Sequence, residues 1–224
     1  KDRFFSIIAH DLKNPFQSLL GFSETLYTDI DKYTKEEIKE YSRIILETSQ
    51  NLFNLLGNLL QWAKSQLGNM PLNPKEIDIH NAVEDVISVL NITAQNKEIN
   101  IKNLVTNNIV VWADKHVIAT VLRNLISNAI KFTNKGGVIT ISAIKEENDI
   151  KISVNDNGKG ISQENIDRLF KIEEGFSTKG TENESGTGLG LILCNELLTQ
   201  SNGTLNVESS LGKGSTFHFT LPGV

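Results

Sequence analysis

A polar cluster interrupts an otherwise apolar helical pattern near the start of the chain, where His10, Asp11, Lys13 and Asn14 stand directly before Pro15. Phosphorylation of a histidine needs a neutral imidazole nitrogen with an exposed lone pair. A neighbouring carboxylate, such as that of Asp11, can hold the other ring N–H, fix the tautomer and stabilise the cation that forms. A histidine on a helix is more often a packed or solvated residue, so the cluster alone leaves both interpretations open.

A second group of polar side chains is predicted to share one helix face farther along the chain. Asn124, Asn128 and Lys131 are spaced i, i+4, i+7. An amide oxygen suits Mg²⁺, which takes hard oxygen ligands beside phosphate oxygens, and a lysine supplies positive charge for the phosphates. The alternative is the solvent face of an amphipathic helix, although asparagine is a poor helix former that a plain surface would not favour twice in one turn.

The first of two glycine-containing segments ends a predicted strand. Residues 155–161 read Asn-Asp-Asn-Gly-Lys-Gly-Ile and carry Asp156, Gly158 and Gly160. A buried carboxylate can accept a hydrogen bond from an adenine amino group, and glycine lets the backbone approach a planar ring closely. An ordinary turn explains the same residues, because Asn-Gly and Asp-Asn are common turn pairs.

The second segment, residues 186–191, reads Gly-Thr-Gly-Leu-Gly-Leu and leads into an apolar helix. Its glycines permit close contact with a phosphate, and the helix N-terminus offers N–H groups and a positive dipole to an anion. No Lys-Ser/Thr pair follows in the register of a Walker A loop, and no strand precedes the segment as a dinucleotide fingerprint requires. The segment therefore indicates a different kind of phosphate site.

Two long helices are predicted to carry the first cluster. Residues 2–30 form one helix and residues 35–67 the other, in which apolar residues recur at alternating spacings of three and four. A capping box of Thr34 and Glu37 is expected to start the second helix. Two helices with wide apolar faces cannot bury both faces against each other, so a dimeric four-helix bundle is the expected assembly. A monomeric hairpin covered by the second domain is the alternative.

A linker is predicted at residues 69–76, because two prolines and two asparagines cluster there. It separates an all-α helical hairpin at 1–68 from an α+β two-layer sandwich at 77–224. The second domain is expected to contain helices at 80–95, 115–133 and 188–200, of which the second is capped by Asp114. Its strands are expected as a pair at 99–104 and 109–112 and at 138–145 and 150–156, followed by an irregular stretch at 157–187 and a closing hairpin that turns at 212–214.

Composition narrows the function classes. The 224 residues include 22 basic and 27 acidic ones, a net charge of −5 without a basic stripe, which argues against nucleic-acid binding. Cys194 is the only cysteine, which excludes an intramolecular disulfide and a cysteine-rich zinc site. No apolar run approaches the roughly 18 residues required to span a bilayer. We expect a cytoplasmic segment of a longer protein, whose membrane anchor, where it has one, lies outside this segment.

The order of these segments resembles the sensor histidine kinases of two-component systems, and the resemblance covers nearly the whole chain. Residues 10–16, His-Asp-Leu-Lys-Asn-Pro-Phe, are similar to the phosphoacceptor box, residues 123–133 to the N box and residues 186–191 to the G2 box. Residues 170–185 are similar to the F box and ATP lid, but lack the arginine of the commoner Phe-x-x-Phe-Tyr-Arg pattern. Residues 212–217 resemble the final glycine box.

The resemblance implies a dimerisation and phosphoacceptor hairpin followed by an ATPase domain of the GHKL type, with ATP and Mg²⁺ as cofactors. It implies autophosphorylation on His10, with Asp11 as the acid/base partner, and transfer of the phosphoryl group to an aspartate of a response-regulator receiver domain. Asn14 would position water in a second activity, dephosphorylation of the regulator.

The resemblance also implies a nucleotide site. Asn128 would bind magnesium, Asp156 would bind adenine and Ser215 would support the adenine site. Lys179 is the candidate for the γ-phosphate contact, with a solvated lysine as the alternative. The remaining implied members are Asn124, Lys131, Phe132, Gly158, Gly160, Gly186, Thr187, Gly188, Leu189 and Gly190.

Two other function classes fit part of the pattern. Another GHKL ATPase, of the gyrase, chaperone or mismatch-repair type, would share the nucleotide boxes but not the helical hairpin that carries His10. A non-catalytic dimerisation and signalling module would have a decayed nucleotide site, whereas Asn128, Asp156 and the glycines are intact.

Overall fold

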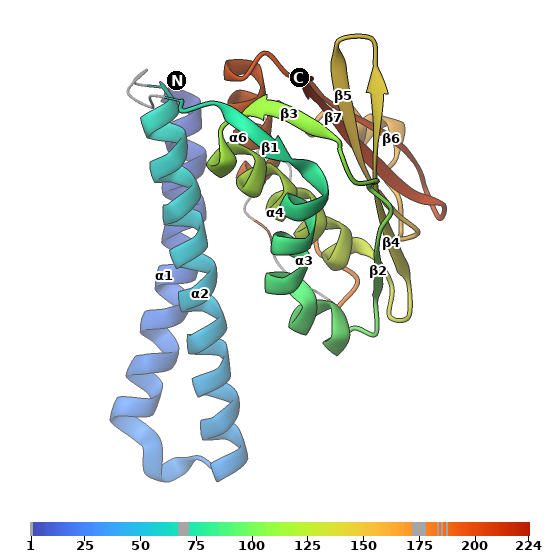
Figure 1. Ribbon diagram of the computed structural model, residues 1–224. Helices are drawn as coiled ribbons and strands as arrows, with labels where there is room; N and C mark the ends of the chain where they lie inside the picture. The colour runs from blue at the N-terminus through green and yellow to red at the C-terminus, as the bar shows by residue number, and fades with distance from the viewer. Residues whose placement is uncertain (1, 67–71, 172–177, 183, 185, 187) are drawn as a thin grey trace.

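The computed structural model describes residues 2–66, 72–171, 178–182, 184, 186 and 188–224. Two long helices, α1 (Asp2–Asp29) and α2 (Lys35–Gln66), lie side by side as a hairpin (Figure 1). A short 3-10 helix, η1 (Ile30–Lys32), connects them, and α1 continues through Pro15. The predicted helical hairpin at the start of the chain is confirmed.

The predicted capping box at the start of α2 is also confirmed. The Thr34 backbone N–H donates to Glu37 Oε2 at 2.8 Å, and the Glu37 N–H donates to Thr34 Oγ1 at 3.2 Å. These two bonds satisfy donors that the first turn of a helix leaves without partners. The box therefore sets where α2 begins.

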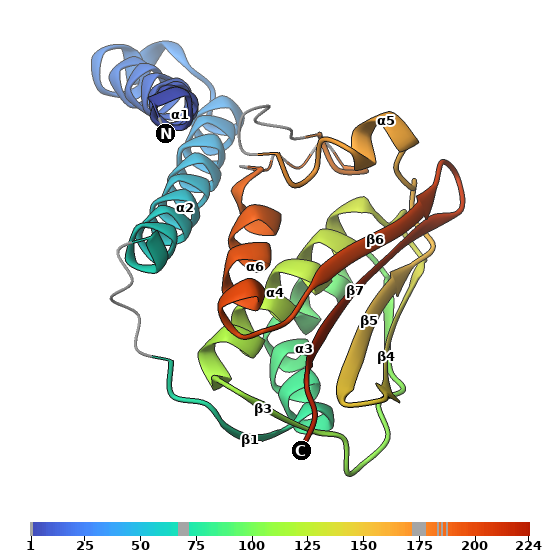
Figure 2. The same cartoon turned by 90° about the horizontal axis from the view of Figure 1, so that it is seen from above.

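Apolar surface remains exposed on the hairpin. Leu20, Tyr27, Phe53 and Leu60 are 64%, 89%, 78% and 62% exposed, respectively. The second domain covers part of α2 through α6 (Leu189–Gln200), which packs against it (Figure 2). These exposed apolar side chains are consistent with the predicted dimer, because exposed apolar surface commonly marks protein–protein contacts. Dimerisation stays a prediction.

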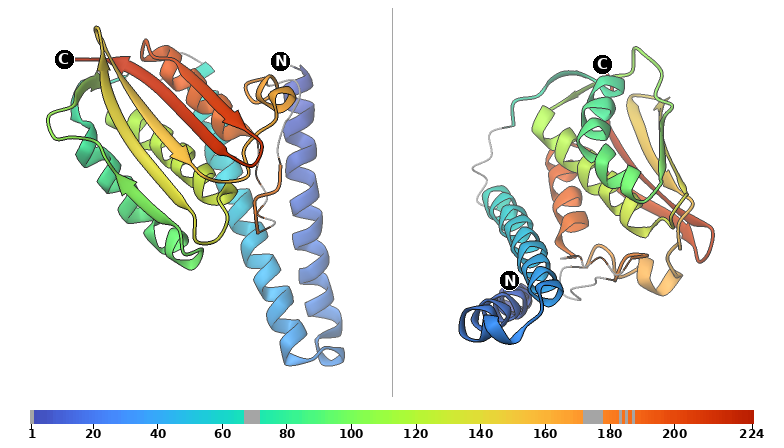
Figure 3. Two further views of the ribbon diagram at one scale, coloured as in Figure 1. Left: turned by 90° about the vertical axis from the view of Figure 1, so that its right-hand side faces the viewer. Right: turned by 90° about the horizontal axis from the view of Figure 1, so that it is seen from below.

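The second domain is built on a mixed five-stranded sheet whose one face is covered by helices α3, α4 and α6 (Figure 3). Only β2 and β4 pair in parallel, and the other neighbours are antiparallel. The predicted two-layer sandwich is confirmed. The strands, in sheet order, are β2 (Asn100–Asn103), β4 (Val138–Glu146), β5 (Asp149–Asp156), β7 (Gly214–Pro222) and β6 (Leu205–Ser210), and the other two helices are α3 (Ile79–Asn96) and α4 (Lys115–Phe132).

The core lies between this sheet and α4. Ile139 and Ile141 on β4, Ile152 on β5 and Phe219 on β7 are fully buried at alternate strand positions, as a half-buried sheet requires. They share one hydrophobic cluster with α4 residues such as Leu122. Each such side chain contributes about 1.5–3 kcal/mol of burial free energy, so α4 is held firmly to the sheet.

The predicted pairing of strands 99–104 and 109–112 is wrong. Strand β2 pairs with β4, and β3 (Val110–Ala113) pairs with β1 (Lys75–Asp78), which was not predicted. Two short strands separated by a turn look like a hairpin in sequence. Here α4 returns the chain so that β4 lies parallel to β2, which is the connection that parallel pairing needs.

Two smaller features complete the domain. A short helix, α5 (Gln163–Ile166), interrupts the stretch predicted to be irregular. The closing hairpin of β6 and β7 is confirmed, and Gly212 and Gly214 take positive φ angles of 75° and 93° at its turn. Within the described ranges, no helix is long and apolar enough to cross a membrane.

Asp114 caps α4, as the sequence predicted, and has a further contact. Its Oδ1 accepts the His116 N–H at 2.7 Å, and its Oδ2 accepts the Asn73 N–H at 2.9 Å. Burial alone would raise the pKa of this carboxyl group, but the N–H donors hold the pKa below its ordinary value. The carboxylate thus ties the chain that enters the second domain to the start of α4.

We expect Asp114→Ala to lower the free energy of unfolding by about 1–3 kcal/mol, because it removes a helix cap and a second hydrogen bond. Since the pKa is lower in the folded state, this stabilisation is complete above the ordinary carboxyl pKa and is lost as the pH falls through the folded value. Urea unfolding of both proteins at neutral and acidic pH measures the effect.

Asp78→Ala is the matched control, because Asp78 caps α3 through one described bond, to the Asn81 N–H. It should cost about 1 kcal/mol. Equal losses for the two variants, or an Asp114→Ala effect that does not shrink in acid, would contradict this account.

Candidate functional site

Helix α4 positions the site because its two faces differ in character. Leu122, Leu125 and Ile126 are buried against the sheet and the neighbouring helices. Asn124 and Asn128 lie on the other side and are partly exposed. The amphipathic pattern that packs the helix therefore also orients its polar side chains outward.

A cleft of about 780 Å³ lies along this polar face. It is lined by parts of α2 and α4, by the loop after β5, by the start of α6 and by the first residues of β7. Gly158, Lys179 and Leu189 are not among its described lining residues, and Thr187 falls outside the described part of the chain. The cleft brings together ten of the expected nucleotide residues: Asn124, Asn128, Lys131, Phe132, Asp156, Gly160, Gly186, Gly188, Gly190 and Ser215.

Asp156 ends β5 inside this cleft and is only 4% exposed. Its Oδ1 accepts the Gly158 N–H at 2.8 Å and the Ser215 N–H at 3.3 Å. Burial raises the pKa of the carboxyl group, although these two bonds oppose the shift. Because both bonds end on Oδ1 within the described structure, Oδ2 keeps acceptor capacity for a ligand amino group.

The glycines after β5 are needed for packing as well as for ligand approach. A Cβ at Gly158 would collide with the backbone carbonyl of Phe132, and a Cβ at Gly160 would collide with that of Ser210. Gly160 also takes a positive φ of 67°. Glycine at these positions lets the loop after β5 lie directly against the end of α4, at Gly158, and against the end of β6, at Gly160.

The start of α6 forms the opposite wall. Gly188 caps the helix in a left-handed conformation, with φ 69°. Gly188, Gly190 and Leu191 line the cleft, so the first turn of α6 presents its backbone N–H groups there. A Cβ at Gly190 would collide with Asn124 Oδ1, so this glycine lets α6 lie close to α4. The arrangement is suited to an anion.

Two lysines bring positive charge to the cleft. The ammonium groups of Lys131 and Lys159 lie 4.7 and 4.8 Å from the centre of the Phe132 ring. Burial lowers the pKa of Lys131, Glu184 opposes this shift, and the nearby cations Lys159 and Lys97 add to it. A bound phosphate would therefore relieve repulsion between these ammonium groups. Lys159 was not predicted as a site residue.

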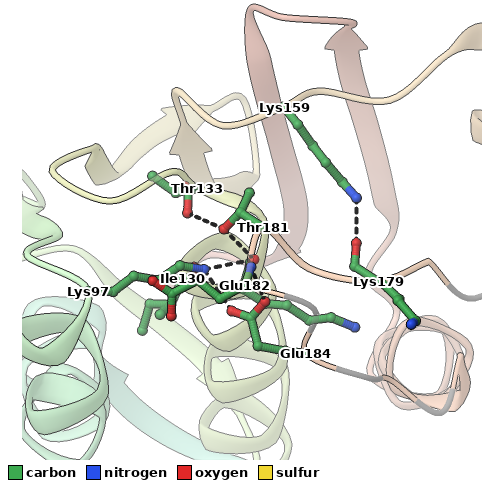
Figure 4. A network of polar contacts seen from close by, with 9 residues as sticks. Lys97, Ile130, Thr133, Lys159, Lys179, Thr181, Glu182 and Glu184 are labelled. Atoms are coloured by element: carbon green, nitrogen blue, oxygen red, sulfur yellow. Dashed lines mark hydrogen bonds and ion pairs between the residues drawn. The ribbon is translucent and has the colours of Figure 1, made fainter.

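A polar network surrounds the end of α4, as Figure 4 shows. Lys97 donates to the carbonyls of Ile130 and Lys131 and to Glu184, and Lys159 donates to the carbonyl of Lys179 at 2.6 Å. Lys179 itself is exposed and uses its backbone in this contact. Its proposed contact with the γ-phosphate stays a prediction.

The hairpin of α1 and α2 contributes to the same cleft. Asn51, Phe53 and Gly57 of α2 are among the lining residues. None of them was predicted, because their spacing on α2 is that of an ordinary amphipathic helix. Only the packing of the two domains brings them to the nucleotide residues.

The expected catalytic residues lie on α1. His10 and Asp11 are within the helix, but their side chains fall outside the described structure. Asn14 is exposed one turn after His10. Residues four apart lie on the same helix face, so His10 and Asn14 share a face of α1.

The residues present fit a magnesium ion shared with a nucleotide better than a metal held by protein alone. Among the described residues, no cluster of three or more His, Cys, Asp or Glu side chains could hold a metal ion. Mg²⁺ typically keeps several waters and binds through one or two protein groups plus substrate phosphates. Asn128 in the cleft can supply one such oxygen.

Each of the two domains of the chain is similar to a known protein family. Residues 1–68 match the His Kinase A (phospho-acceptor) domain, and residues 113–224 match the histidine kinase-, DNA gyrase B- and HSP90-like ATPases. The chain is 34% identical over 228 residues to sensor protein EvgS of Escherichia coli O157:H7, covering 99% of this chain and 19% of that protein. It is 31% identical over 228 residues to the adaptive-response sensory kinase SasA of Crocosphaera subtropica, covering 99% of this chain and 59% of that protein.

Solved structures share the fold. The histidine kinase AdeS of Acinetobacter baumannii superimposes with a TM-score of 0.77 at 22% identity, over 95% of this chain and 97% of that chain. The histidine kinase ThkA in complex with response regulator protein TrrA gives a TM-score of 0.77 at 22% identity, over 98% of this chain and 61% of that chain.

The two family matches fall on the hairpin and on residues 113–224 of the sandwich, and the phospho-acceptor match distinguishes the chain from ATPases of the gyrase and chaperone types. The chain spans only part of the length of its curated relatives, 19% of EvgS and 59% of SasA. It belongs to the sensor histidine kinases, the ATP-dependent phosphotransferases of two-component systems, and joins a phospho-acceptor domain to an ATP-binding domain.

Proposed function

We propose that this segment binds ATP with Mg²⁺ in the cleft, phosphorylates its own His10 and passes the phosphoryl group to an aspartate of a response-regulator receiver domain. One observation carries the proposal: α2 of the phosphoacceptor hairpin and α4 and α6 of the ATPase domain line the same cleft. Because α1 packs against α2, the helix that bears His10 is next to a wall of the nucleotide site. The division into 1–68, a linker at 69–76 and 77–224 is part of the proposal.

Asp156 and Ser215 would hold the adenine. The Asp156 carboxylate accepts the exocyclic amino group, and its fixed bond to the Ser215 N–H sets its orientation. Ile161 and Phe217 line the same cleft and offer apolar surface to the ring. A buried acceptor of this kind selects adenine over a purine with a carbonyl at the same position, which would leave the carboxylate without a donor.

The polar face of α4 and the first turn of α6 would hold the phosphates. Lys131 supplies charge, and the N–H groups beside Gly188 supply donors. Asn128 would hold Mg²⁺, which when bound neutralises charge on the phosphate oxygens. The protein contributes chiefly positioning and electrostatic stabilisation to this kind of transfer.

His10 would attack through a neutral ring nitrogen. A bond forms between this nitrogen and the γ-phosphorus, the bond to the bridging oxygen breaks, and ADP leaves. Asp11 would hold the N–H of the other ring nitrogen and stabilise the cation. The phosphoryl group then passes from the imidazole to the receiver aspartate, which restores the neutral ring.

We infer a homodimer in which the exposed apolar side chains of α1 and α2 pack against those of a second copy. The exposure of Leu20, Tyr27 and Leu60 supports this assembly. The segment would act in the cytoplasm as part of a longer sensor, since ATP and receiver domains are available there.

The central test is incubation with γ-labelled ATP and Mg²⁺. We expect acid-labile label on the wild-type protein and none on His10→Gln, because a phosphoramidate bond hydrolyses in acid. His116→Gln is the matched control, since His116 is exposed at the start of α4 and should keep its label. Acid-stable label, or equal label on His10→Gln, would rule out His10 as the acceptor.

Asp156→Asn should weaken ATP binding without weakening the fold. Loss of a hydrogen bond to a charged group costs about 1.5–3 kcal/mol, or about 10–100-fold in Kd by calorimetry. The pKa of Asp156 is raised in the folded protein, so a neutral side chain removes an unfavourable charge above that pKa, and the free energy of unfolding at neutral pH should not fall.

Asp149→Asn, at the far end of β5, is the control and should bind ATP normally. Unchanged affinity in Asp156→Asn would remove this residue from the adenine site. Lost affinity accompanied by lost stability would make its role structural.

Phosphatase activity is a separate proposal for Asn14. We expect Asn14→Ala to slow dephosphorylation of a phosphorylated receiver domain while the label on His10 still forms, because an exposed amide one turn from His10 can orient a water molecule. Gln17→Ala, an exposed change on the same helix, is the control. Regulator dephosphorylation at the wild-type rate in Asn14→Ala would end this proposal.

A further inference from the structure

Lys97 is a buried cation outside the nucleotide residues described above. It is the C-cap residue of α3, and its side chain is only 4% exposed. Its ammonium group donates to Ile130 O at 2.9 Å, Lys131 O at 3.0 Å and Glu184 Oε1 at 2.7 Å (Figure 4). An ammonium group has three donors, so these acceptors use all of them. A buried charge with a complete set of partners is fixed in place.

Two of the three acceptors belong to the last turn of α4. The final carbonyls of a helix have no partner within the helix, and a cation there also interacts favourably with the helix dipole. The same turn carries Lys131 and Phe132, which line the cleft. Lys97 therefore stabilises the backbone that presents these two side chains to the nucleotide.

The third acceptor extends the contact into the segment 178–184, of which the structure describes residues 178–182 and 184. Glu184 Oε2 accepts the Glu182 N–H at 2.7 Å, and Glu184 O accepts the Gly180 N–H at 2.9 Å. The Thr181 N–H donates to Lys131 O at 3.0 Å. Glu184 thus holds Gly180 through its carbonyl and Glu182 through its carboxylate, and the bond from Lys97 links it to the end of α4.

The start of the fixed segment and residues that follow it line the cleft, whereas Lys97 and Glu184 do not. Thr178 is the first residue of the segment, and Gly186 and Gly188 follow it toward α6. Movement of Glu184 away from Lys97 would displace these lining residues together with Lys131. It would leave Asp156 in place, because the described bonds of Asp156 come from Gly158 and Ser215.

We propose that Lys97 and Glu184 are positioning residues for the nucleotide phosphates, and that their ion pair fixes the end of α4 and the described residues 178–182 and 184 beside the cleft in the geometry that binds a triphosphate. The proposal rests on the proposed function of the cleft as the ATP site. It makes a selective claim: the pair sets affinity for the phosphates and leaves affinity for the adenosine moiety unchanged.

The test compares ATP and adenosine binding by calorimetry in Lys97→Met and Glu184→Gln. Met keeps the length of the side chain without its charge, and Gln keeps the shape of Glu184 without its charge. We expect the Kd for ATP to rise about 10-fold or more in Lys97→Met, because hydrogen bonds from a charged group are lost. The rise should be smaller in Glu184→Gln, because only one of these bonds is changed. The Kd for adenosine should change by less than about 2-fold, within the scatter of surface substitutions.

The control is Lys135→Met, which breaks the 3.0 Å pair of Lys135 with Glu98, whose side chains are 60% and 65% exposed. Exposed pairs contribute little, so both affinities should stay at wild-type values. Trypsin should also cleave after the exposed Lys179 faster in Glu184→Gln than in the wild type, because the neighbouring segment is less firmly held.

Each result decides the proposal. Equal weakening of ATP and adenosine in either variant would overturn it, since that is the pattern of general structural damage. Unchanged ATP affinity in Glu184→Gln would overturn it as well. Because the Glu184 side chain is partly exposed, this variant should fold and so tests the proposal even where Lys97→Met does not fold. If the wild type binds ATP and labels His10 while both variants bind like the wild type, only this inference fails. If the wild type binds no ATP, the proposed function fails first.

Discussion

Three backbone carbonyls at the end of α4 need partners from outside the helix, and the geometry of the site depends on how those partners are supplied. The Lys97 ammonium group donates hydrogen bonds to Ile130 O and Lys131 O. The Thr181 N–H also donates to Lys131 O, and the Lys159 N–H donates to Phe132 O at 3.1 Å. The end of α3, the loop after β5 and the 178–184 segment therefore converge on one helix end. Unpaired buried carbonyls are costly, so displacing any one of these segments leaves a carbonyl of this helix end short of a partner.

The two halves of the cleft are held by different kinds of structure. Asp156 pairs with Ser215 in the register of β5 and β7, two inner strands of the sheet, so the position of its carboxylate is set by the hydrophobic core. The phosphate side is formed by loop residues and the first turn of α6, and is held by a few polar contacts. Polar contacts can be exchanged for water more easily than core packing, so this side is the one able to adapt to the length of the phosphate chain.

The sequence predicted the elements that depend on local patterns. The box of Thr34 and Glu37 and the cap at Asp114 follow from neighbouring residues, and so does the polar face of α4. The pairing of β2 with β4 depends on where α4 returns the chain, which no local pattern encodes. Lys97 was not predicted for a similar reason, because a lysine that follows a helix is usually solvated. Its partner, the carboxylate of Glu184, lies 87 positions later in the sequence. Only the assembled fold places Phe53 of α2 at the cleft.

The charge of the cleft is opposite in sign to that of the chain. The protein carries a net charge of −5, yet the charged side chains described along the cleft are Arg123, Lys131 and Lys159 against the single carboxylate of Asp156. That carboxylate is buried at the end of β5, while the lysines gather around Phe132. A concave site with low-dielectric walls concentrates such a local field. An acidic protein can therefore attract a polyanionic nucleotide, and the separation of the carboxylate from the cations gives the ligand one orientation.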